Sequence, residues 1–383
     1  MIRHHWRHMD RESAHGSRHA NSTSSQLRSI TFSRPAEFHK TLYARVRAHL
    51  KEQGIPRTGG VRIALKMAFI FALLFSSYYV LVFRSDALWV TILSTFLLSQ
   101  AIVLIGFNVM HDAGHGSFSK KKWVNKTLGL SLDLIGGNQW LWGFKHGVLH
   151  HTYTNLETLD DDLDSRGIIR THPDQPWKPY HRYQAIYALP LYGLLYVLWF
   201  FDDFAQFFGR NVGGHATTKP TWKETTLLLV FKVNFVTWGL VVPMILYPWY
   251  WVLLVFMSIQ MVVGLTLAIV FQLAHVVDGV AMPSLEGSRA SIEDQWAAHQ
   301  VRTTANFATG NPLVRWYAGG LNFQIEHHLF ANISHVRYRH IQPIVQKTCV
   351  EFGVPYQCYP TVRSAIKAHI RQLVAMGRKP EVA

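Results

Sequence analysis

Four long runs of apolar residues constrain the fold of this chain more than any other feature of its sequence. A helix that crosses the hydrocarbon core of a bilayer needs roughly 20 predominantly apolar residues, and each run comes close to that length. The runs cover about 67–83, 87–110, 225–247 and 249–274. They predict an all-α integral membrane protein with four transmembrane helices.

The spacing of these runs predicts that they pair into two hairpins. Arg84, Ser85 and Asp86 separate the first two runs, and Pro248 separates the last two. Lys232 lies within the third run. We expect its ammonium group to extend to the membrane surface, because a lysine stem can cover apolar surface while its charged end stays in water.

A fifth apolar stretch, at about 185–201, is shorter, contains Pro190 and ends at Asp202 and Asp203. The histidines that precede the second hairpin can meet those that follow it only if an even number of spans separates them. We therefore expect this stretch to form a helix that lies in the membrane interface without crossing the bilayer.

The distribution of charge predicts the orientation in the membrane. The chain carries a formal net charge of +15 and is 49% hydrophobic. Lys and Arg gather outside the two hairpins, whereas the hairpin turns contain only Arg84, so we expect both termini and the central segment on the cytoplasmic side. Basic residues that flank apolar runs fit anionic lipid head groups better than nucleic acid, and no nucleic-acid partner is expected.

Composition also suggests how the chain is divided. Residues 1–60 are rich in Ser, Arg and His and poor in acids, which predicts a basic, disordered leader, with a targeting segment as the alternative. We expect one membrane domain over 61–345, followed by a cytoplasmic helical tail over 346–383. Cys349 and Cys358 are too few for a disulfide framework or an iron–sulfur cluster.

Histidines gather at the predicted cytoplasmic ends of the spans. His111 and His115 follow the second span, and residues four apart lie on one face of a helix. A second cluster repeats this spacing and adds an adjacent ring, a third contains two adjacent histidines, and one more histidine ends the fourth span. The candidate metal ligands are His111, His115, His146, His150, His151, His275, His327 and His328.

The number of these histidines indicates the kind of metal site. Imidazole suits Fe, Zn, Cu and Ni, but eight rings exceed what one ion can hold and match two ions. A structural zinc site would be closed by four ligands, often thiolates, and both cysteines are remote in sequence. A histidine-rich pair of irons at a membrane surface favours O₂ activation. A metal transporter, which should place ionisable residues at the bilayer midplane, and a structural metal site are the alternatives.

Several other polar residues bear on this site. We expect neighbouring side chains to accept the free ring N–H groups of the ligands and to fix their tautomers. The candidates for this role are Asn108, Asp112, Asn155, Asn322 and Glu326. The acidic run Asp160, Asp161, Asp162 and Asp164 is expected to be a solvated loop.

Three motifs resemble those of the membrane fatty-acid desaturases. They are His111-Asp-Ala-Gly-His115, His150-His151-Thr-Tyr-Thr-Asn155 and Phe323-Gln324-Ile-Glu-His327-His328-Leu-Phe330, and the resemblance covers roughly residues 65–341. Most desaturases begin the third motif with histidine. With Gln324 at that position, the third motif resembles that of the front-end subgroup, which includes enzymes of the linoleoyl-CoA or acyl-lipid delta-6 type.

The resemblance implies the fold, the cofactor and the reaction. It implies a cytoplasmic helical cap that holds a non-heme di-iron site above four spans, with the eight histidines as ligands and Gln324 acting through a water or a hydrogen bond. The enzyme would use O₂ to introduce a cis double bond into an acyl chain carried by a lipid or by coenzyme A. A lipid hydroxylase or ketolase on the same scaffold is the nearest alternative.

The resemblance also implies a separate electron donor. The chain contains no His-Pro-Gly-Gly heme motif, since its one His-Pro pair continues as His172-Pro173-Asp174-Gln175. A ferredoxin is the expected donor and a free b-type cytochrome is the alternative. The expected location is a bacterial inner membrane.

Overall fold

The computed structural model describes residues 31–33, 37–163, 165–284 and 291–380. Contacts group Thr31–Ala383 into one unit, to which everything below refers. Four helical segments in this unit are long and apolar enough to cross a membrane, in agreement with the number of spans predicted. They are Val61–Phe83, Leu88–Gly114, Trp222–Leu246 and Trp249–His275.

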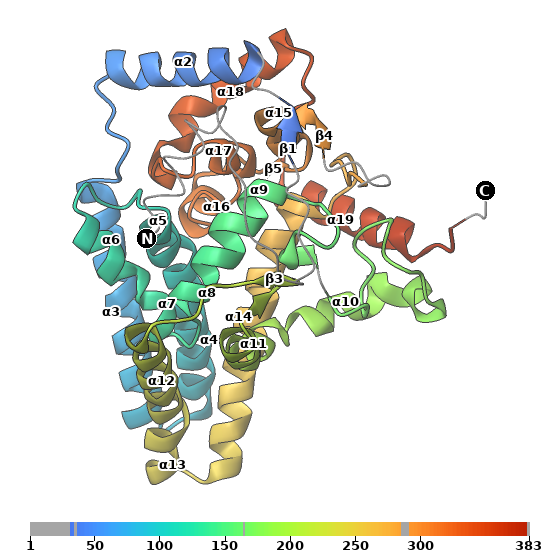
Figure 1. Ribbon diagram of the computed structural model, residues 1–383. Helices are drawn as coiled ribbons and strands as arrows, with labels where there is room; N and C mark the ends of the chain where they lie inside the picture. The colour runs from blue at the N-terminus through green and yellow to red at the C-terminus, as the bar shows by residue number, and fades with distance from the viewer. Residues whose placement is uncertain (1–30, 34–36, 164, 285–290, 381–383) are drawn as a thin grey trace. The chain divides into compact units, whose positions relative to one another are not determined.

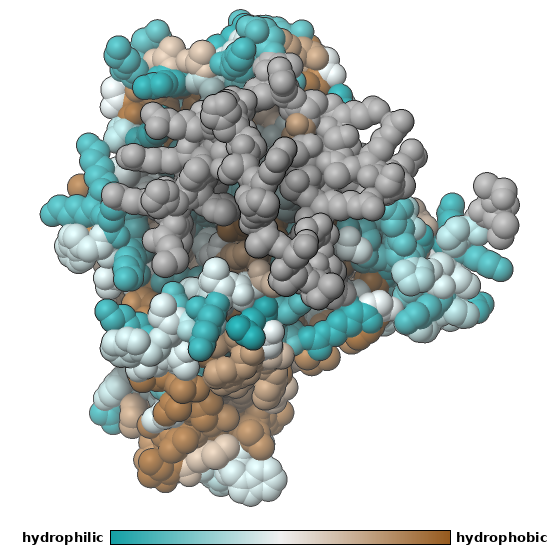
Figure 2. Space-filling view, viewed as in Figure 1, coloured by the Kyte–Doolittle hydropathy of each residue, from teal (hydrophilic) through white to brown (hydrophobic). Residues whose placement is uncertain are grey.

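These segments are built mainly from α3 (Val61–Phe83), α4 (Leu88–Ile105), α12 (Trp222–Val236) and α14 (Trp249–His275). Helix α4 packs between α3 and α14, and α13 (Val242–Leu246) packs on α14 (Figure 1). Ile70, Leu98 and Val263 are buried between them. Phe75 is 61% exposed and Ile245 is 75% exposed, and apolar residues cover the lower part of the view in Figure 2. An apolar surface of this extent is expected of helices that face lipid.

The first span begins six residues before the predicted start. Helix α3 already includes Arg62 and Lys66. Lys66 is accommodated because its ammonium group is buried and donates to the carbonyl oxygen of Trp316 at 2.5 Å. A charged residue can thus belong to this helix because the protein supplies the partner that water would otherwise provide.

The fifth apolar stretch is two helices rather than the one predicted. α10 (Gln184–Tyr192) and α11 (Leu195–Gly209) meet at an angle of 79°, and α11 continues past Asp202 and Asp203. The break lies against α14, where a Cβ at Gly264 would come within 2.4 Å of the carbonyl oxygen of Gly193. Two glycines therefore let the backbones approach closely at this point.

The expectation that Lys232 extends to the surface is wrong. Its side chain is 3% exposed, and its ammonium group lies 2.6 Å from Oδ2 of Asp203 on α11 and 2.6 Å from the carbonyl oxygen of Gly136. A carboxylate and a carbonyl within the protein thus replace water around this charge.

The predicted leader is described only in part, because residues 1–30 and 34–36 lie outside the described residues. Residues 37–52 are not disordered as predicted: they form α2 (Glu37–Glu52). Phe38, Leu42, Val46 and Leu50, spaced four residues apart, are buried, and α2 packs on α18 (Tyr338–Glu351). The helix forms because this apolar stripe has a surface to cover.

Shorter elements complete the described part of the chain. Helix α18 crosses the predicted boundary at 345, and α19 (Val362–Gly377) packs on α10 and α14. Strands β1 (Thr31–Ser33) and β4 (Ser291–Gln295) pair in parallel, as do β5 (Asn306–Phe307) and β6 (Cys358–Tyr359), whereas β2 (Asn211–Val212) and β3 (His215–Ala216) are antiparallel. Apart from the short helices that carry the histidine clusters, the remaining elements are α6 (Lys122–Gly129), α7 (Ser131–Leu134), α8 (Gln139–Phe144), η3 (Asp161–Leu163), η4 (Pro179–Tyr183), η5 (Thr237–Val241), α15 (Trp296–Arg302), α16 (Pro312–Tyr317) and η6 (His335–Arg337).

Candidate metal centre

The first pair of histidines follows a wide helical turn. Helix α4 passes into the π-helical turn η1 (Gly106–Met110) and then into α5 (His111–Gly114). π-Turns are rare and occur frequently at functional sites. The rings of His111 and His115 lie side by side, with centroids 4.8 Å apart.

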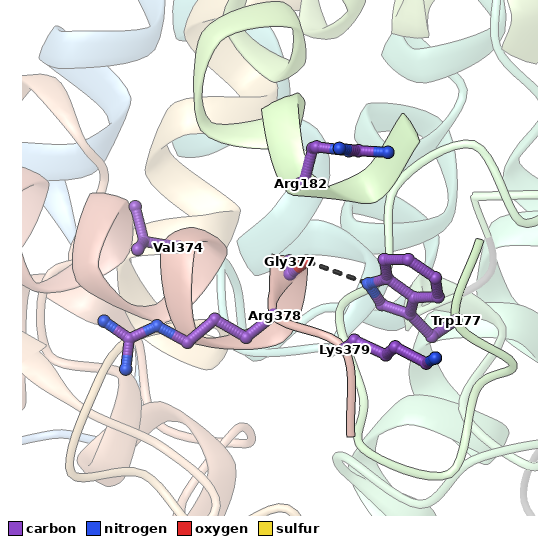
Figure 3. A pocket seen from close by; sticks show the side chains of 6 residues that line it. All are labelled: Trp177, Arg182, Val374, Gly377, Arg378 and Lys379. Atoms are coloured by element: carbon purple, nitrogen blue, oxygen red, sulfur yellow. Dashed lines mark hydrogen bonds between the residues drawn. The ribbon is translucent and has the colours of Figure 1, made fainter. Parts of the chain in front are cut away.

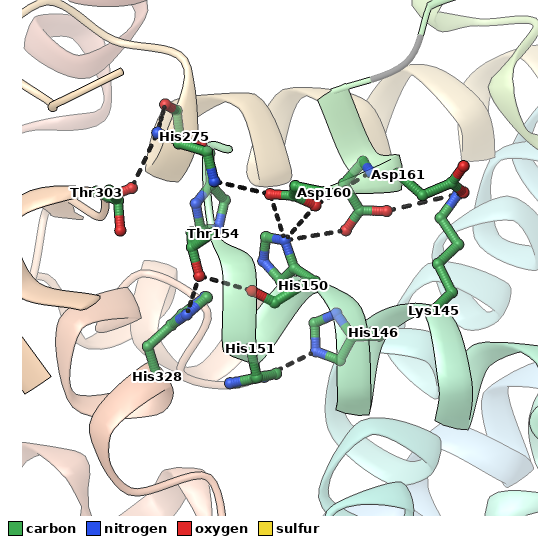
Figure 4. Close-up of polar contacts among 12 residues, drawn as sticks. Lys145, His146, His150, His151, Thr154, Asp160, Asp161, His275, Thr303 and His328 are labelled. Atoms are coloured by element: carbon green, nitrogen blue, oxygen red, sulfur yellow. Dashed lines mark hydrogen bonds and ion pairs between the residues drawn. The ribbon is translucent and has the colours of Figure 1, made fainter. Parts of the chain in front are cut away.

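The second cluster lies on another π-turn. His146 and His150 belong to η2 (Lys145–His150), and His151 begins α9 (His151–Tyr153). In an α-helix, His151 would point about 140° away from His146, five residues earlier. The wider π-turn brings residues five apart to the same side. Nε2 of His151 accordingly lies 3.2 Å from Nε2 of His146 (Figure 4).

The third cluster lies on the short helix α17 (Gln324–Leu329), whose start is fixed by Asn306. The amide oxygen of Asn306 accepts from the backbone N–H of Ile325 at 3.0 Å, and its amide nitrogen donates to Glu326 at 2.8 Å. Tyr356 donates a second 2.8 Å hydrogen bond to Glu326. The carboxyl group is fully buried, and burial raises its pKa to about 7. These contacts hold α17 against β5.

The structure brings all eight predicted histidines together. His111, His115, His146 and His327 form one group whose ring nitrogens could hold a metal ion, since one from each lies within 4.8 Å of the others. His150, His275 and His328 form a second such group. His151 lies between them, with ring centroids 4.6 Å from His327 and 4.4 Å from His328. Segments far apart in sequence thus converge on two adjoining groups of imidazoles.

Several ring nitrogens in these groups lack hydrogen-bond partners. Within the described part of the chain, Nε2 of His111, His115, His327 and His328 and Nδ1 of His275 are buried without one. Leaving a buried polar atom unpaired costs about 1–3 kcal/mol, so five in one cluster need an explanation. A metal ion held by their lone pairs supplies it, and the donor set fits non-heme iron.

Electrostatics favours the neutral, metal-binding form of most of these rings. Burial, followed by repulsion from neighbouring histidines, lowers the pKa of His115, His146, His151 and His328 well below its usual value. His150 differs: burial opposes its charge, but the carboxylates of Asp160 and Asp162 together outweigh burial and raise its pKa.

Three residues outside the predicted set contact the free side of ligand rings. Asp160 lies 3.0 Å from Nδ1 of His150, Gln300 Oε1 lies 2.7 Å from Nδ1 of His328, and the Tyr338 hydroxyl lies 3.2 Å from Nδ1 of His327. Asp160 was expected in a solvated loop, but it is 3% exposed and also accepts from the backbone N–H of Asn155 (Figure 4). That expectation is wrong for Asp160, because its carboxylate points inward onto a histidine.

The five polar residues predicted for that role make other contacts. Asp112 lies 3.0 Å from Nδ1 of His335 and accepts from Ser334 at 2.6 Å. Asn155, in a left-handed conformation with φ 58°, donates to the carbonyl oxygens of His275 and Thr303.

The remaining two predicted asparagines also bond to main chain. Asn108 donates to the carbonyl oxygens of Leu104 and Tyr317, and Asn322 donates to that of Phe307. Together with the hydrogen bonds that Glu326 accepts from Asn306 and Tyr356, these contacts join the segments that carry the ligands.

Gln324 lies beside the second group. Its amide nitrogen is 3.3 Å from Nε2 of His275, and its buried Oε1 has no hydrogen-bond partner among the described residues. The amide is therefore close enough to act together with His150, His275 and His328.

Comparisons with known proteins identify the family. The family model described as fatty acid desaturase matches residues 87–360. The chain belongs to the fatty acid desaturase family. Membership makes it an oxidoreductase that acts on fatty acids, and neither a metal transporter nor a purely structural metal site fits it.

Its relatives among the desaturases include two enzymes of the same name. The chain is 36% identical over 354 residues to an sn-1 linoleoyl-lipid 6-desaturase of Arthrospira platensis. The aligned region covers 92% of this chain and 96% of the relative. It is 34% identical to an enzyme of the same name from Synechocystis sp., covering 91% of this chain and 98% of the relative. An acyl-lipid (8-3)-desaturase of Physcomitrium patens is 36% identical, with 89% and 72% covered.

Proposed function

We propose that this desaturase is a front-end acyl-lipid desaturase that introduces a cis double bond between an existing double bond and the carboxyl end of the chain. The names of its relatives support this, since those from Arthrospira platensis and Synechocystis sp. are sn-1 linoleoyl-lipid 6-desaturases. Gln324, at the head of the third histidine motif, agrees with the same subgroup. The substrate is then an acyl-lipid, with acyl-CoA as the alternative carrier.

The observation that carries the proposed O₂-dependent chemistry is the convergence of the histidines into overlapping groups that could each hold a metal ion. His111, His115, His146 and His327 would hold one iron, and His150, His275 and His328 would hold the second, with His151 within reach of both. Gln324 would complete the second group through a water or a hydrogen bond. The chemistry that such a pair supplies, when bound, is the O₂-dependent removal of two hydrogen atoms from adjacent methylenes.

The protein contributes orientation to this reaction. Asp160, Gln300 and Tyr338 hold the Nδ1 side of three rings, which directs their Nε2 atoms toward the centre. Asn155 ties the second histidine motif to the end of α14 at His275. Overall, O₂, two electrons and two protons are consumed and two waters are formed, so the reaction needs an electron donor.

We further propose how the enzyme lies in the membrane. The spans would form two hairpins below a cytoplasmic helical cap, with both termini and the metal centre on the cytoplasmic side of a bacterial inner membrane. The concentration of Lys and Arg outside the hairpin turns supports this orientation. The bent pair α10 and α11 would lie in the interface. The electron donor would be a separate ferredoxin, with a free b-type cytochrome as the alternative.

Expression in a host supplied with linoleate, followed by mass spectrometry of its fatty acids, tests the reaction. We expect a new double bond on the carboxyl side of the existing ones, and about two irons in each purified chain. His327→Ala and His328→Ala should abolish the product, while His340→Ala, on the surface of α18, should not. Absence of a new double bond, full activity in the first two variants, or purified protein dominated by zinc would overturn the proposal. A hydroxylated or oxo product would favour the hydroxylase or ketolase alternative.

A further inference from the structure

A basic cavity lies at the C-terminal end of α19, outside the metal centre. Its volume is about 410 Å³. The residues that line it come from the end of α19 and the segment after it, from η4 and from the segment before η4. They are Trp177, Arg182, Val374, Gly377, Arg378 and Lys379 (Figure 3). Neither the metal centre nor the proposed reaction uses any of them.

Hydrogen bonds to main chain hold this cavity in place. The indole N–H of Trp177 donates to the carbonyl oxygen of Gly377 at 2.8 Å, Arg170 donates to that of Met376 at 2.9 Å, and Gln184 donates to that of Leu373 at 2.8 Å. These donors satisfy carbonyl groups that the end of a helix leaves unpaired. At Gly377 a Cβ would lie 2.5 Å from the carbonyl oxygen of His181, so the two backbones are in direct contact.

The charge of the cavity is unbalanced. Arg182, Arg378 and Lys379 are exposed, and none forms an ion pair with a described acidic residue. Among the described residues, the lining contains three cations and an indole but no carboxylate. Guanidinium groups bind phosphate oxygens through paired N–H donors, and an ammonium group adds a point charge. This chemistry fits a phosphate group.

The exposed face of α19 indicates where that phosphate lies. Ile366, Ile370 and Val374 are spaced four residues apart and are 37%, 39% and 44% exposed. They form an apolar stripe along the helix. A parallel stripe contains the exposed Arg363, Lys367 and Arg371, of which Arg371 is paired with Asp278 at 2.5 Å. An apolar stripe beside a basic one is typical of a helix that lies on an anionic membrane surface.

Helix α10 extends this surface toward the membrane. Tyr183 before its first residue, Ile186 and Leu189 are 56%, 77% and 41% exposed. α10 packs on α19, where the hydroxyl of Tyr192 lies 3.0 Å from Nε2 of His369, and it also packs on the membrane-spanning α14. Exposed tyrosines beside apolar residues are typical of the membrane–water interface.

We propose that the cavity binds the phosphate of an anionic phospholipid head group at the membrane surface. Arg182 and Lys379 contact the phosphate beside the Trp177 indole, and the apolar stripe of α19 contacts the acyl chains. Arg378, whose side chain extends to the other side of Gly377 in Figure 3, adds positive charge at the same surface. The proposal rests on the membrane insertion of the four spans but not on the reaction at the metal centre.

Lipid binding to the purified full chain tests this site. Native mass spectrometry in detergent would titrate the protein with dioleoyl phosphatidylglycerol and, separately, with dioleoyl phosphatidylcholine. We expect the wild type to bind phosphatidylglycerol at one site about tenfold more tightly or better, since each surface cation contributes about 1 kcal/mol toward anionic lipid. The triple variant Arg182→Gln, Arg378→Gln, Lys379→Gln should lose this preference.

A matched variant separates the site from net charge. Lys40→Gln, Arg47→Gln and Lys51→Gln remove the same charge from the exposed side of α2 and should keep the preference. The proposal is overturned if the cavity variant keeps the preference, if the α2 variant loses it equally, or if millimolar inorganic phosphate displaces the lipid, which would assign the cavity to a soluble phosphate. The lipid-binding experiment measures no turnover, so the two proposals can fail separately. If the chain prefers phosphatidylglycerol but forms no double bond, only the proposed reaction is overturned.

Discussion

Nε2 of His146 lies 3.2 Å from Nε2 of His151, although the two residues are five positions apart. In an α-helix such residues point about 140° apart, whereas the i→i+5 pattern of a π-turn aligns them. The contact has a consequence for the site. His146 belongs to the group with His111 and His115, and His151 adjoins the group with His328, so one wide turn allows a short segment to serve both groups.

Replacing Asp160 with Asn should weaken the second group. Asp160 holds Nδ1 of His150 at 3.0 Å and also accepts from the backbone N–H of Asn155, so it fixes both the ring and the following turn. Loss of a carboxylate behind a metal-binding histidine typically costs 10- to 100-fold in metal affinity or activity, and we expect about that loss. Iron per purified chain and product formation measure it. Asp202→Asn, on the surface of α11, is the control, and equal iron content and turnover in the two variants would contradict the prediction.

Gln300 should act through its oxygen alone. Oε1 lies 2.7 Å from Nδ1 of His328 and accepts from Thr154 at 2.9 Å, while Nε2 has no partner among the described residues. Gln300→Leu keeps the volume but removes the acceptor, and should lower iron content and activity by roughly tenfold. Gln300→Glu keeps an acceptor at the same position and should retain more of both. If the two variants have equal iron content, activity and thermal stability, the acceptor oxygen of Gln300 does not support the metal centre.

The spans and the histidines could be predicted because each depends on local sequence. Apolar length alone sets a membrane span, and the predicted ends of the last span lie within one residue of Trp249–His275. The spacing of His111 and His115 identifies a pair without any knowledge of the fold. The start of the first span was missed because Lys66 finds a partner, the carbonyl oxygen of Trp316, that is 250 residues away.

What sequence alone did not reveal depends on distant contacts. Gln300 and Tyr338 belong to no motif, and their role appears only when α15 and α18 pack against α17. Asp160 was visible, but in a run of four acids a solvated loop is the ordinary interpretation. Only the fold shows that Asp160 contacts His150, whereas Asp161 is paired with Lys145. The break between α10 and α11 depends on Gly193 meeting Gly264, two residues with no periodic signal.

The contact between Gly193 and Gly264 predicts that one added methyl group will lower the stability of the protein strongly. A Cβ at Gly264 would lie 2.4 Å from the carbonyl oxygen of Gly193 and 3.0 Å from that of Tyr192, and backbone atoms cannot yield as a side chain can. Gly264→Ala should therefore force α10 away from α14 and destabilise the protein by about 1–3 kcal/mol. Thermal unfolding of the detergent-purified chain measures this. Gly209→Ala, at the end of α11 with nothing near its Cβ position, should leave the midpoint unchanged, and equal midpoints in both variants would refute the clash.

Asp133 should make stability depend on pH. Burial raises its pKa to about 7, despite a hydrogen bond from the backbone N–H of Gln139 at 3.1 Å. Between the unfolded value of 3.8 and about 7, the folded chain retains a proton that the unfolded chain has released. The free energy of unfolding that Asp133 contributes therefore falls as pH rises through this window and stays low above it.

Replacing Asp133 with Asn removes that titration, so the variant should gain stability relative to wild type as pH rises. We expect the two proteins to differ little near about pH 5 and the variant to be more stable near about pH 8, by roughly 1–3 kcal/mol. Apparent melting temperatures across this range measure the difference, with Asp86→Asn as an exposed control that should parallel the wild type. A constant offset at all pH values would show that Asp133 is ionised throughout and that burial does not hold its proton.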